Sequence, residues 1–163
     1  MSSQKIIFLD FDGVLNSIGT KDRIIHPLFY HKIRGLDDFR VKLVSDLAIE
    51  KSADIVISST WREFYQLNEL ISLLGSRGMR ANIIGRTPIA HEEIFDNRKM
   101  RIDREDEIEA WMKQNGVPDY FLILDDIQTK FKDNQVKTSD GTGFFSGLLK
   151  RSRKILDTKV NND

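Results

Sequence analysis

The 163-residue sequence contains no cysteine, and this absence excludes several kinds of chemistry. Without thiols the chain can form no disulfide, no iron–sulfur cluster and no cysteine-ligated zinc site. A thiolate nucleophile is excluded as well, so any hydrolysis of phosphate esters must use another group.

The sequence also lacks an excess of charge and any long apolar run. Its 25 basic and 25 acidic residues give a formal net charge of zero, which provides no overall attraction to nucleic acid or to anionic membranes. The first apolar run ends at Asp10, far short of a signal-peptide core or a membrane span. We therefore expect a cytoplasmic protein without a membrane span, although a secreted protein with a non-cleaved signal would share these features.

The length and the remaining composition indicate a folded chain. Hydrophobic residues make up 40% of the sequence and charged residues 31%, a balance typical of folded rather than disordered proteins. A chain of this size buries roughly two thirds of its unfolded surface. We expect a single domain over residues 1–163.

Five short apolar runs predict strands. Three of them are continuous rather than alternating, as expected for strands buried on both faces of a parallel sheet. The runs are Lys5–Leu9, Asp54–Ile57, Ala81–Ile84, Tyr120–Leu124 and, more weakly, Gln135–Thr138.

Apolar residues spaced three and four apart predict helices between these strands. Helices are expected over Asp37–Lys51, from Phe64 to Leu74, around Ile108–Met112 and from Phe145 toward Leu156. Alternating strands and helices predict an α/β fold, a three-layer αβα sandwich around a doubly wound, mostly parallel five-stranded sheet. In such sheets ligands bind beyond the carboxyl ends of the strands.

Acidic residues stand where two of the predicted strands end. Asp10 and Asp12 follow the first strand, and Asp125 and Asp126 follow the fourth run. If these strands are neighbours, their carboxylates converge at one edge of the sheet and repel each other unless a hard divalent cation lies among them. Oxygen ligands of this kind favour Mg²⁺. The sequence therefore predicts a magnesium site formed by these four aspartates.

The same strand ends offer groups suited to phosphoryl transfer. One carboxylate can act as a nucleophile, and a second can protonate the leaving oxygen and then activate water. Ser58, which follows the second strand, could hold a phosphoryl oxygen. Of Ser58 and Ser59, we expect one to cap the next helix and the other to contact phosphate. Ser59 and Arg62 are candidate substrate-binding residues, with an ion pair as the alternative role for Arg62, whereas Trp61 is expected to pack.

Four segments resemble the motifs of the haloacid dehalogenase (HAD) superfamily. IIFLDFDGVLN (6–16) resembles the first motif, and IVISSTWR (55–62) resembles the second. YFLILDD (120–126) is similar to the acidic fourth motif. The third motif needs a basic residue at the start of the helix before that last strand, and Arg104 in REDEIEAW is similar to it, with Arg101 as a second candidate.

The resemblance implies a role for each matched residue. Asp10 would be the nucleophile, and Asp12 would be the general acid/base. Ser58 would bind the phosphoryl group, and Arg104 would stabilise the aspartyl-phosphate. An acid at position 12 is typical of members that hydrolyse phosphate esters rather than carbon–halogen bonds.

The resemblance also implies how Mg²⁺ would be held. Asp10 and Asp126 would ligate it directly, and Asp12 would contribute its backbone carbonyl. Asp125 would either ligate the ion or orient the basic partner of the nucleophile.

Two features bear on the substrate. Residues 16–36 leave room only for a short flap or hairpin, where larger members insert a cap domain, and an open site implies a bulky substrate such as a phosphoprotein carrying phosphotyrosine or phosphoserine. TGFFSG (142–147) and the second and fourth motifs look most like small domains in nucleic-acid repair proteins. A nucleic-acid end is therefore the alternative substrate, although the balanced charge does not favour it. An alternative of another class is a phospho-accepting signalling or binding module without turnover.

Overall fold

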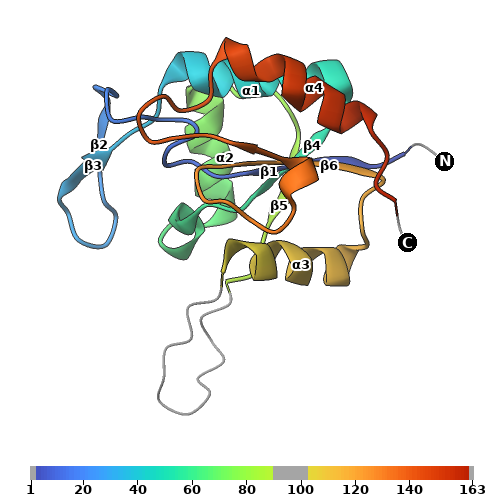
Figure 1. Ribbon diagram of the computed structural model, residues 1–163. Coiled ribbons are helices and arrows are strands. Elements are labelled where there is room, and N and C mark those ends of the chain that lie inside the picture. Colours follow the sequence, from blue (N-terminus) through green and yellow to red (C-terminus); the bar gives the residue numbers. More distant parts are fainter. Residues whose placement is uncertain (1–2, 90–102, 162–163) are drawn as a thin grey trace.

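The computed structural model describes residues 3–89 and 103–161 and shows a five-stranded parallel sheet with helices on both faces (Figure 1). The sheet has the order β5-β4-β1-β6-β7, and a separate antiparallel hairpin pairs β2 with β3. The strands are β1 (Lys5–Leu9), β2 (Arg23–Ile25), β3 (Lys32–Arg34), β4 (Asp54–Ile57), β5 (Ile83–Arg86), β6 (Tyr120–Asp125) and β7 (Gln135–Lys137). The helices are α1 (Asp38–Lys51), α2 (Leu67–Ser76), α3 (Arg104–Asn115) and α4 (Leu149–Asp157), with 3-10 helices η1 (Thr60–Glu63), η3 (Lys132–Asn134) and η4 (Ser146–Leu148).

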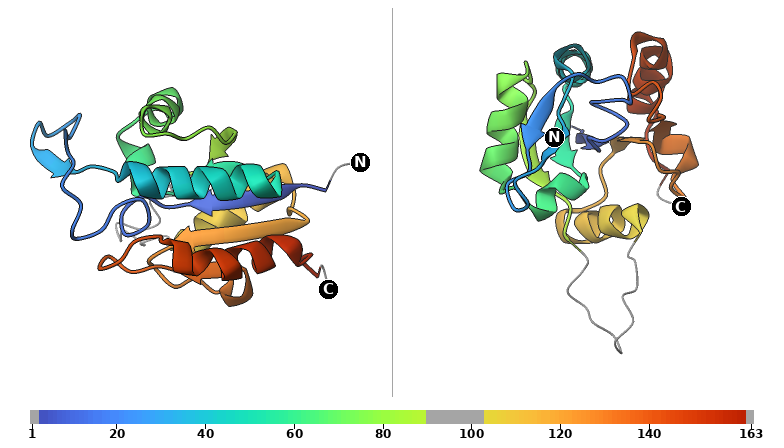
Figure 2. Two further views of the ribbon diagram at one scale, coloured as in Figure 1. Left: turned by 90° about the horizontal axis from the view of Figure 1, so that it is seen from above. Right: turned by 90° about the vertical axis from the view of Figure 1, so that its left-hand side faces the viewer.

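The two faces of the sheet bury two separate apolar cores. Successive residues of a strand point to opposite faces, so β1 contributes to both. Ile7 and Leu9 pack with α1, α2 and α4, whereas Ile6 and Phe8 pack with α3. Figure 2 shows the same division, with α3 alone on one face of the sheet. The predicted three-layer α/β fold is therefore confirmed.

The register of the three central strands makes their carboxyl ends level. Leu9 at the end of β1 lies opposite Ile57 of β4 on one side and Leu124 of β6 on the other. The residues that follow, Asp10 and Ser58, and the last residue of β6 therefore emerge side by side at one edge of the sheet. The expectation that the first and fourth predicted strands are neighbours is confirmed.

One strand and two helices begin later than the sequence predicts. Helix α4 begins at Leu149 rather than Phe145, because residues 146–148 form the 3-10 helix η4. The edge strand β5 begins two residues later than predicted, because the backbone N–H groups of Arg80 and Ala81 donate to the Ser45 hydroxyl of α1 instead of joining the sheet. Helix α2 begins at Leu67 rather than Phe64, because Phe64 ends the 3-10 turn η1. Glu69 and Gln66 then form a reciprocal cap at the start of α2.

The ring of Phe39 in α1 is exposed, although its four-residue spacing from Leu43 and Leu47 predicts that it faces the core. Phe39 is 61% exposed, whereas the neighbouring Arg40 is buried. The Arg40 guanidinium donates to the Asp37 carboxylate and to the backbone carbonyl of Phe144, and the Phe39 ring lies over it. The buried residue at this turn of α1 is therefore a hydrogen-bonded arginine, and the phenylalanine ring lies on the outside.

The segment between β1 and α1 forms the short hairpin that the sequence predicted for residues 16–36. Strands β2 and β3 project beyond the carboxyl edge of the main sheet, at the left in Figure 1. Among the described helices, none has both the length and the apolar character needed to cross a bilayer.

Candidate active site

Three of the four predicted aspartates gather at the level strand ends. Asp10, Asp125 and Asp126 each place one carboxylate oxygen within 4.8 Å of those of the other two. Asp10 and Asp125 are buried, and Asp126 is half-buried. The side chain of Asp12 is not part of this cluster, so the expected contact of Asp12 with the metal through its backbone carbonyl stays a prediction.

A glycine makes the close approach of the two acidic segments feasible. Gly13 adopts φ +75°, and a Cβ atom there would lie 2.5 Å from Asp126 Oδ2. Both the backbone angle and the contact exclude a larger residue without rearrangement. The turn is also held by Thr138, whose hydroxyl donates to the Gly13 carbonyl, and by the Asn16 side-chain oxygen, which accepts from the Gly13 N–H.

The predicted basic residue reaches this cluster from the start of α3. Arg104 Nε lies 2.8 Å from Asp125 Oδ2, and its terminal nitrogen NH2 lies 3.6 Å from Asp10 Oδ1. Burial by itself lowers the pKa of Arg104, but the charges of these two carboxylates outweigh it and raise the pKa above its ordinary value. The alternative candidate, Arg101, lies outside the described residues. The geometry thus places Arg104 beside the expected nucleophile.

Glu107 is a residue of the site that the motif analysis missed. Its Oε2 atom lies 2.6 Å from Arg62 NH2 and 3.5 Å from Arg104 NH1, so it links the two guanidiniums. The available sequence signal was the three-residue spacing from Arg104, which places both residues on one face of a helix. The contact with Arg62 follows only from tertiary structure.

Arg62 and Ser59 have positioning roles in place of the predicted substrate contacts. The Arg62 guanidinium is fully buried and donates to the backbone carbonyls of Ser58, Ser59, Thr87 and Pro88. The Ser59 hydroxyl is buried and accepts from the Trp61 N–H at the start of η1. Neither side chain is open to a substrate, and Ser59 is the capping member of the serine pair.

Ser58 is the serine with a free hydroxyl. Its Oγ is buried without a hydrogen-bond partner. Three other buried polar atoms nearby also lack one: Thr87 Oγ1, Arg104 Nε and Asp125 Oδ2. The last two form an ion pair, but without hydrogen-bond geometry. All four residues lie at the carboxyl edge of the sheet or at the start of α3 beside it. Buried polar atoms are normally paired, so their concentration here indicates a place that a polar ligand completes.

Asp12 projects outward from the same turn. Its Oδ1 accepts from the Asn16 side-chain amide, and its Oδ2 accepts from the indole N–H of Trp61. Trp61 is 2% exposed, so the expectation that it packs is confirmed, but its N–H also orients the acid. Asp12 itself is exposed and can meet both a substrate and water.

The charges of the buried site do not balance. Among the described residues, Asp10, Asp125, Asp126 and Glu107 face two guanidiniums, those of Arg62 and Arg104, which leaves this set with a formal charge of minus two. Burial, followed by the charge of Asp125, raises the pKa of Asp10 well above its ordinary value. Burial likewise raises the pKa of Asp125, against the effect of Arg104. A divalent cation among oxygen ligands would neutralise this charge, so the residues fit Mg²⁺.

The raised pKa of Asp10 predicts how pH and Mg²⁺ affect stability. The folded, metal-free state binds this proton more tightly than the unfolded state, so its contribution to stability is present at low pH and is lost as pH rises through the titration of Asp10. Mg²⁺ binds the ionised form, and we expect it to raise the unfolding temperature more at pH 7.5 than at pH 5. At a hundredfold excess over its Kd, the gain is about 2.7 kcal/mol.

Thermal unfolding of the wild type and of Asp10→Asn, each with EDTA or Mg²⁺, measures this effect. Exposed acids with lowered pKa values, such as Asp46 and Glu50, act in the opposite direction but are common to both proteins. A magnesium shift that is equal at both pH values, or equal in the variant, would contradict the prediction.

A second prediction separates the two serines. Ser58→Ala removes an unpartnered hydroxyl, so we expect unfolding free energy within about 1 kcal/mol of wild type. Turnover of a phosphomonoester is expected to fall about a hundredfold, because a donor to the phosphoryl group is lost. Ser59→Ala serves as the matched control, with a loss of about 1 kcal/mol from the missing cap and little change in turnover. The reverse pattern would exchange the two roles.

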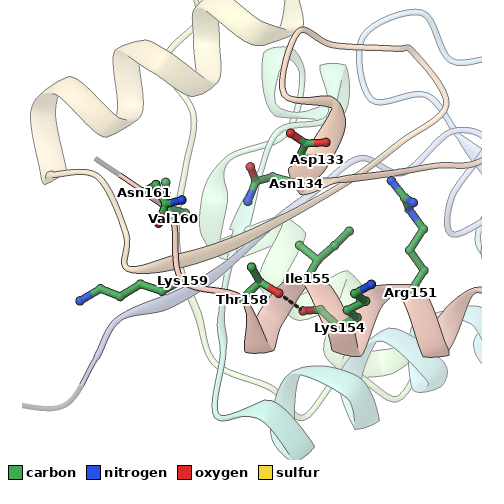
Figure 3. Close-up of a pocket in the computed structure, with 9 residues that line it drawn as sticks. All are labelled: Asp133, Asn134, Arg151, Lys154, Ile155, Thr158, Lys159, Val160 and Asn161. Carbon is green, nitrogen blue, oxygen red and sulfur yellow. Dashed lines mark hydrogen bonds between the residues drawn. The ribbon is translucent and has the colours of Figure 1, made fainter. Parts of the chain in front are cut away.

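A pocket of about 550 Å³ lies at the edge of the sheet opposite the acidic cluster (Figure 3). It is formed around the last turn of α4 and the start of β7, and its lining includes Arg151, Lys154 and Lys159. Lys159 extends away from the other two and pairs with Asp119. The acidic cluster and the unpartnered buried atoms lie at the other edge, so this pocket is not the candidate active site.

The comparison with known protein families agrees with this assignment. The HAD domain of Swiss Army Knife RNA repair proteins matches residues 6–146, a range that contains every element of the site. Neither the curated proteins nor the solved structures contain a significant match. The chain belongs to this family of HAD domains, which confirms the resemblance found in the sequence and places the chain among phosphatase-type hydrolases.

Proposed function

We propose that the chain is a Mg²⁺-dependent phosphomonoesterase that removes a terminal phosphate from a nucleic-acid strand. The observation that carries the proposal is the convergence of Asp10, Asp125 and Asp126 beside the unpartnered hydroxyl of Ser58. A phosphate needs cationic or hydrogen-bonding groups around it, and an acidic cluster needs a cation. One bound metal ion meets both needs.

In the proposed reaction Asp10 attacks the phosphorus atom and forms an aspartyl-phosphate. The bond from phosphorus to the leaving oxygen breaks, and that oxygen takes a proton from Asp12. Asp12 then removes a proton from a water molecule, which hydrolyses the aspartyl-phosphate and restores Asp10. Ser58 holds a phosphoryl oxygen, and Arg104 lies beside the nucleophile. Mg²⁺ held by the carboxylates would stabilise the charge that develops on the phosphoryl oxygens.

The choice of substrate rests on the family. The sequence alone favoured a phosphoprotein, with a nucleic-acid end as the alternative. Membership of a family found in RNA repair proteins supports the nucleic-acid end, and the hairpin β2–β3 leaves the site without a full cap domain. The neutral net charge means that binding would depend on local contacts near the site rather than on overall attraction.

A substrate panel tests the proposal. Phosphate release is measured from oligonucleotides with a 5′- or 3′-phosphate, from phosphotyrosine and phosphoserine peptides and from sugar phosphates, each with Mg²⁺ or EDTA. We expect repeated, metal-dependent turnover with the highest kcat/KM for an oligonucleotide end. Higher kcat/KM for the phosphopeptides would favour a phosphoprotein as the substrate instead. At most one phosphate per protein would indicate a phospho-accepting module, and metal-independent turnover would contradict the mechanism.

A further inference from the structure

A cleft of about 360 Å³ opens directly beside the proposed general acid/base. The hairpin forms one side with His26, Ile33 and Arg34, and Asp12 also lines the cleft. The other side consists of the η1 region, with Thr60, Trp61 and Phe64. Because Asp12 would protonate the leaving oxygen, whatever is attached to that oxygen must occupy space next to this residue.

The cleft is lined by aromatic rings that form a row. The rings of His26 and Phe64, which both line the cleft, lie 4.3 Å apart at 39°. The rings of Phe29 and His31 also stack on His26, at 4.8 Å and 5.5 Å. His26 is 7% exposed, and its Nδ1 atom accepts from the backbone N–H groups of Leu28 and Phe29, so its ring is fixed in place. The Phe64 ring is half-buried and also neighbours Trp61 at 6.2 Å. These rings are therefore oriented before any ligand binds.

The charge of the cleft is suited to a nucleotide. Arg34 is the arginine among the described residues that line the cleft, and it pairs with the exposed Asp140. Its guanidinium keeps partial exposure, so a phosphodiester could replace Asp140 as its partner. Aromatic faces together with one cation are the groups that bind unstacked bases and their backbone, whereas a base inside a duplex offers no free face.

We propose that this cleft binds the terminal nucleoside of a single-stranded substrate, with its base against the half-buried Phe64 ring, which His26 holds in place, and the neighbouring phosphodiester at Arg34. The inference rests on the proposed function and names the part of the substrate that the site recognises. Phe64, His26 and Arg34 would determine specificity, and none of them would take part in bond breaking.

The test compares two phosphorylated oligonucleotides that differ only in whether the terminal nucleoside carries a base or is abasic. For the wild type we expect about tenfold higher kcat/KM with the base present, since stacking on one ring contributes that order of affinity. In Phe64→Leu the preference should fall to about twofold or less, because kcat/KM falls much more on the substrate with a base than on the abasic one. Phe39→Leu, the same substitution at an exposed ring of α1 outside the cleft, should keep the full preference.

The other outcomes are distinguishable. Turnover of both oligonucleotides without a preference in the wild type would overturn the stacking site and leave the proposed function standing. An equal loss on both substrates in Phe64→Leu, with the preference retained, would assign Phe64 a structural role and also overturn it. No turnover of any oligonucleotide by the wild type would overturn the proposed function itself. If Phe64→Leu does not fold, Phe64→Met replaces it, since methionine also lacks the ring but fills more of its volume, and we expect the same loss of preference.

Discussion

Asp10→Asn is expected to reduce phosphomonoester turnover at least about a thousandfold, because the amide can neither attack phosphorus nor offer a charged ligand to a metal. Its stability should not fall in the same way. Asp10 is a buried carboxylate beside Asp125 and Asp126, and its loss removes repulsion, while Arg104 keeps Asp125 and Glu107 as partners. In EDTA at pH 7.5 we expect the variant to unfold at or above the wild-type temperature.

Parallel measurements of released phosphate and of thermal unfolding check this result. Asp133→Asn is the matched control, since it removes an exposed carboxylate at the opposite edge of the sheet and should leave both quantities unchanged. Retained turnover in Asp10→Asn would remove Asp10 from the role of nucleophile. A large drop in stability would show instead that the charge of Asp10 is needed to hold Arg104.

Arg62→Ala is expected to cost about 3–5 kcal/mol of unfolding free energy, the largest effect on stability that we predict. The buried guanidinium satisfies four backbone carbonyls in the segments after β4 and β5 and pairs with Glu107 at 2.6 Å. Without it, the longer contact with Arg104 is what the described residues leave to Glu107. Turnover should fall as well, because Arg62 donates to the backbone carbonyl of Ser58 and shares Glu107 with Arg104.

Denaturant unfolding of three further proteins identifies the cause of the loss. Arg153→Ala removes a surface arginine paired with Glu50 and should leave the unfolding free energy close to the wild-type value. Arg62→Met should be as unstable as Arg62→Ala if an unpaired buried Glu107 is the main penalty. Adding Glu107→Gln to Arg62→Met should then recover part of the stability, and the absence of any recovery would assign the loss to the unsatisfied carbonyls instead.

Much of the fold could be predicted from local sequence. The continuous apolar runs of β1 and β4 match the observed strands in full, because buried parallel strands leave little freedom in which residues they contain. Predictions were weaker at the edge of the sheet and at the ends of helices. At β5 a hydrogen bond to the Ser45 hydroxyl of α1 shifts the strand, and the sequence around β5 carries no sign of that contact.

The candidate site divides in a similar way. Asp10, Asp12 and Ser58 could be identified because each follows a recognisable strand, and strand ends are where such sheets bind ligands. The sequence could not distinguish the roles of Ser58 and Ser59, which depend on which hydroxyl faces η1 and which faces the acidic cluster. It also could not show that Arg62 points inward, because an arginine after a strand end suits an ion pair and a substrate contact equally.

The sequence by itself determined the order of strands and helices, the chemical groups at the strand ends and the family to which the chain belongs. Only the tertiary structure decided which of those groups meet. The pairing of β1 with both β4 and β6 brings Asp10 beside Asp125, and Glu107 couples Arg62 to Arg104 across the site. Local patterns reflect the backbone preferences and burial of neighbouring residues, whereas these contacts join segments far apart in the chain and are fixed by packing and charge once the sheet has formed.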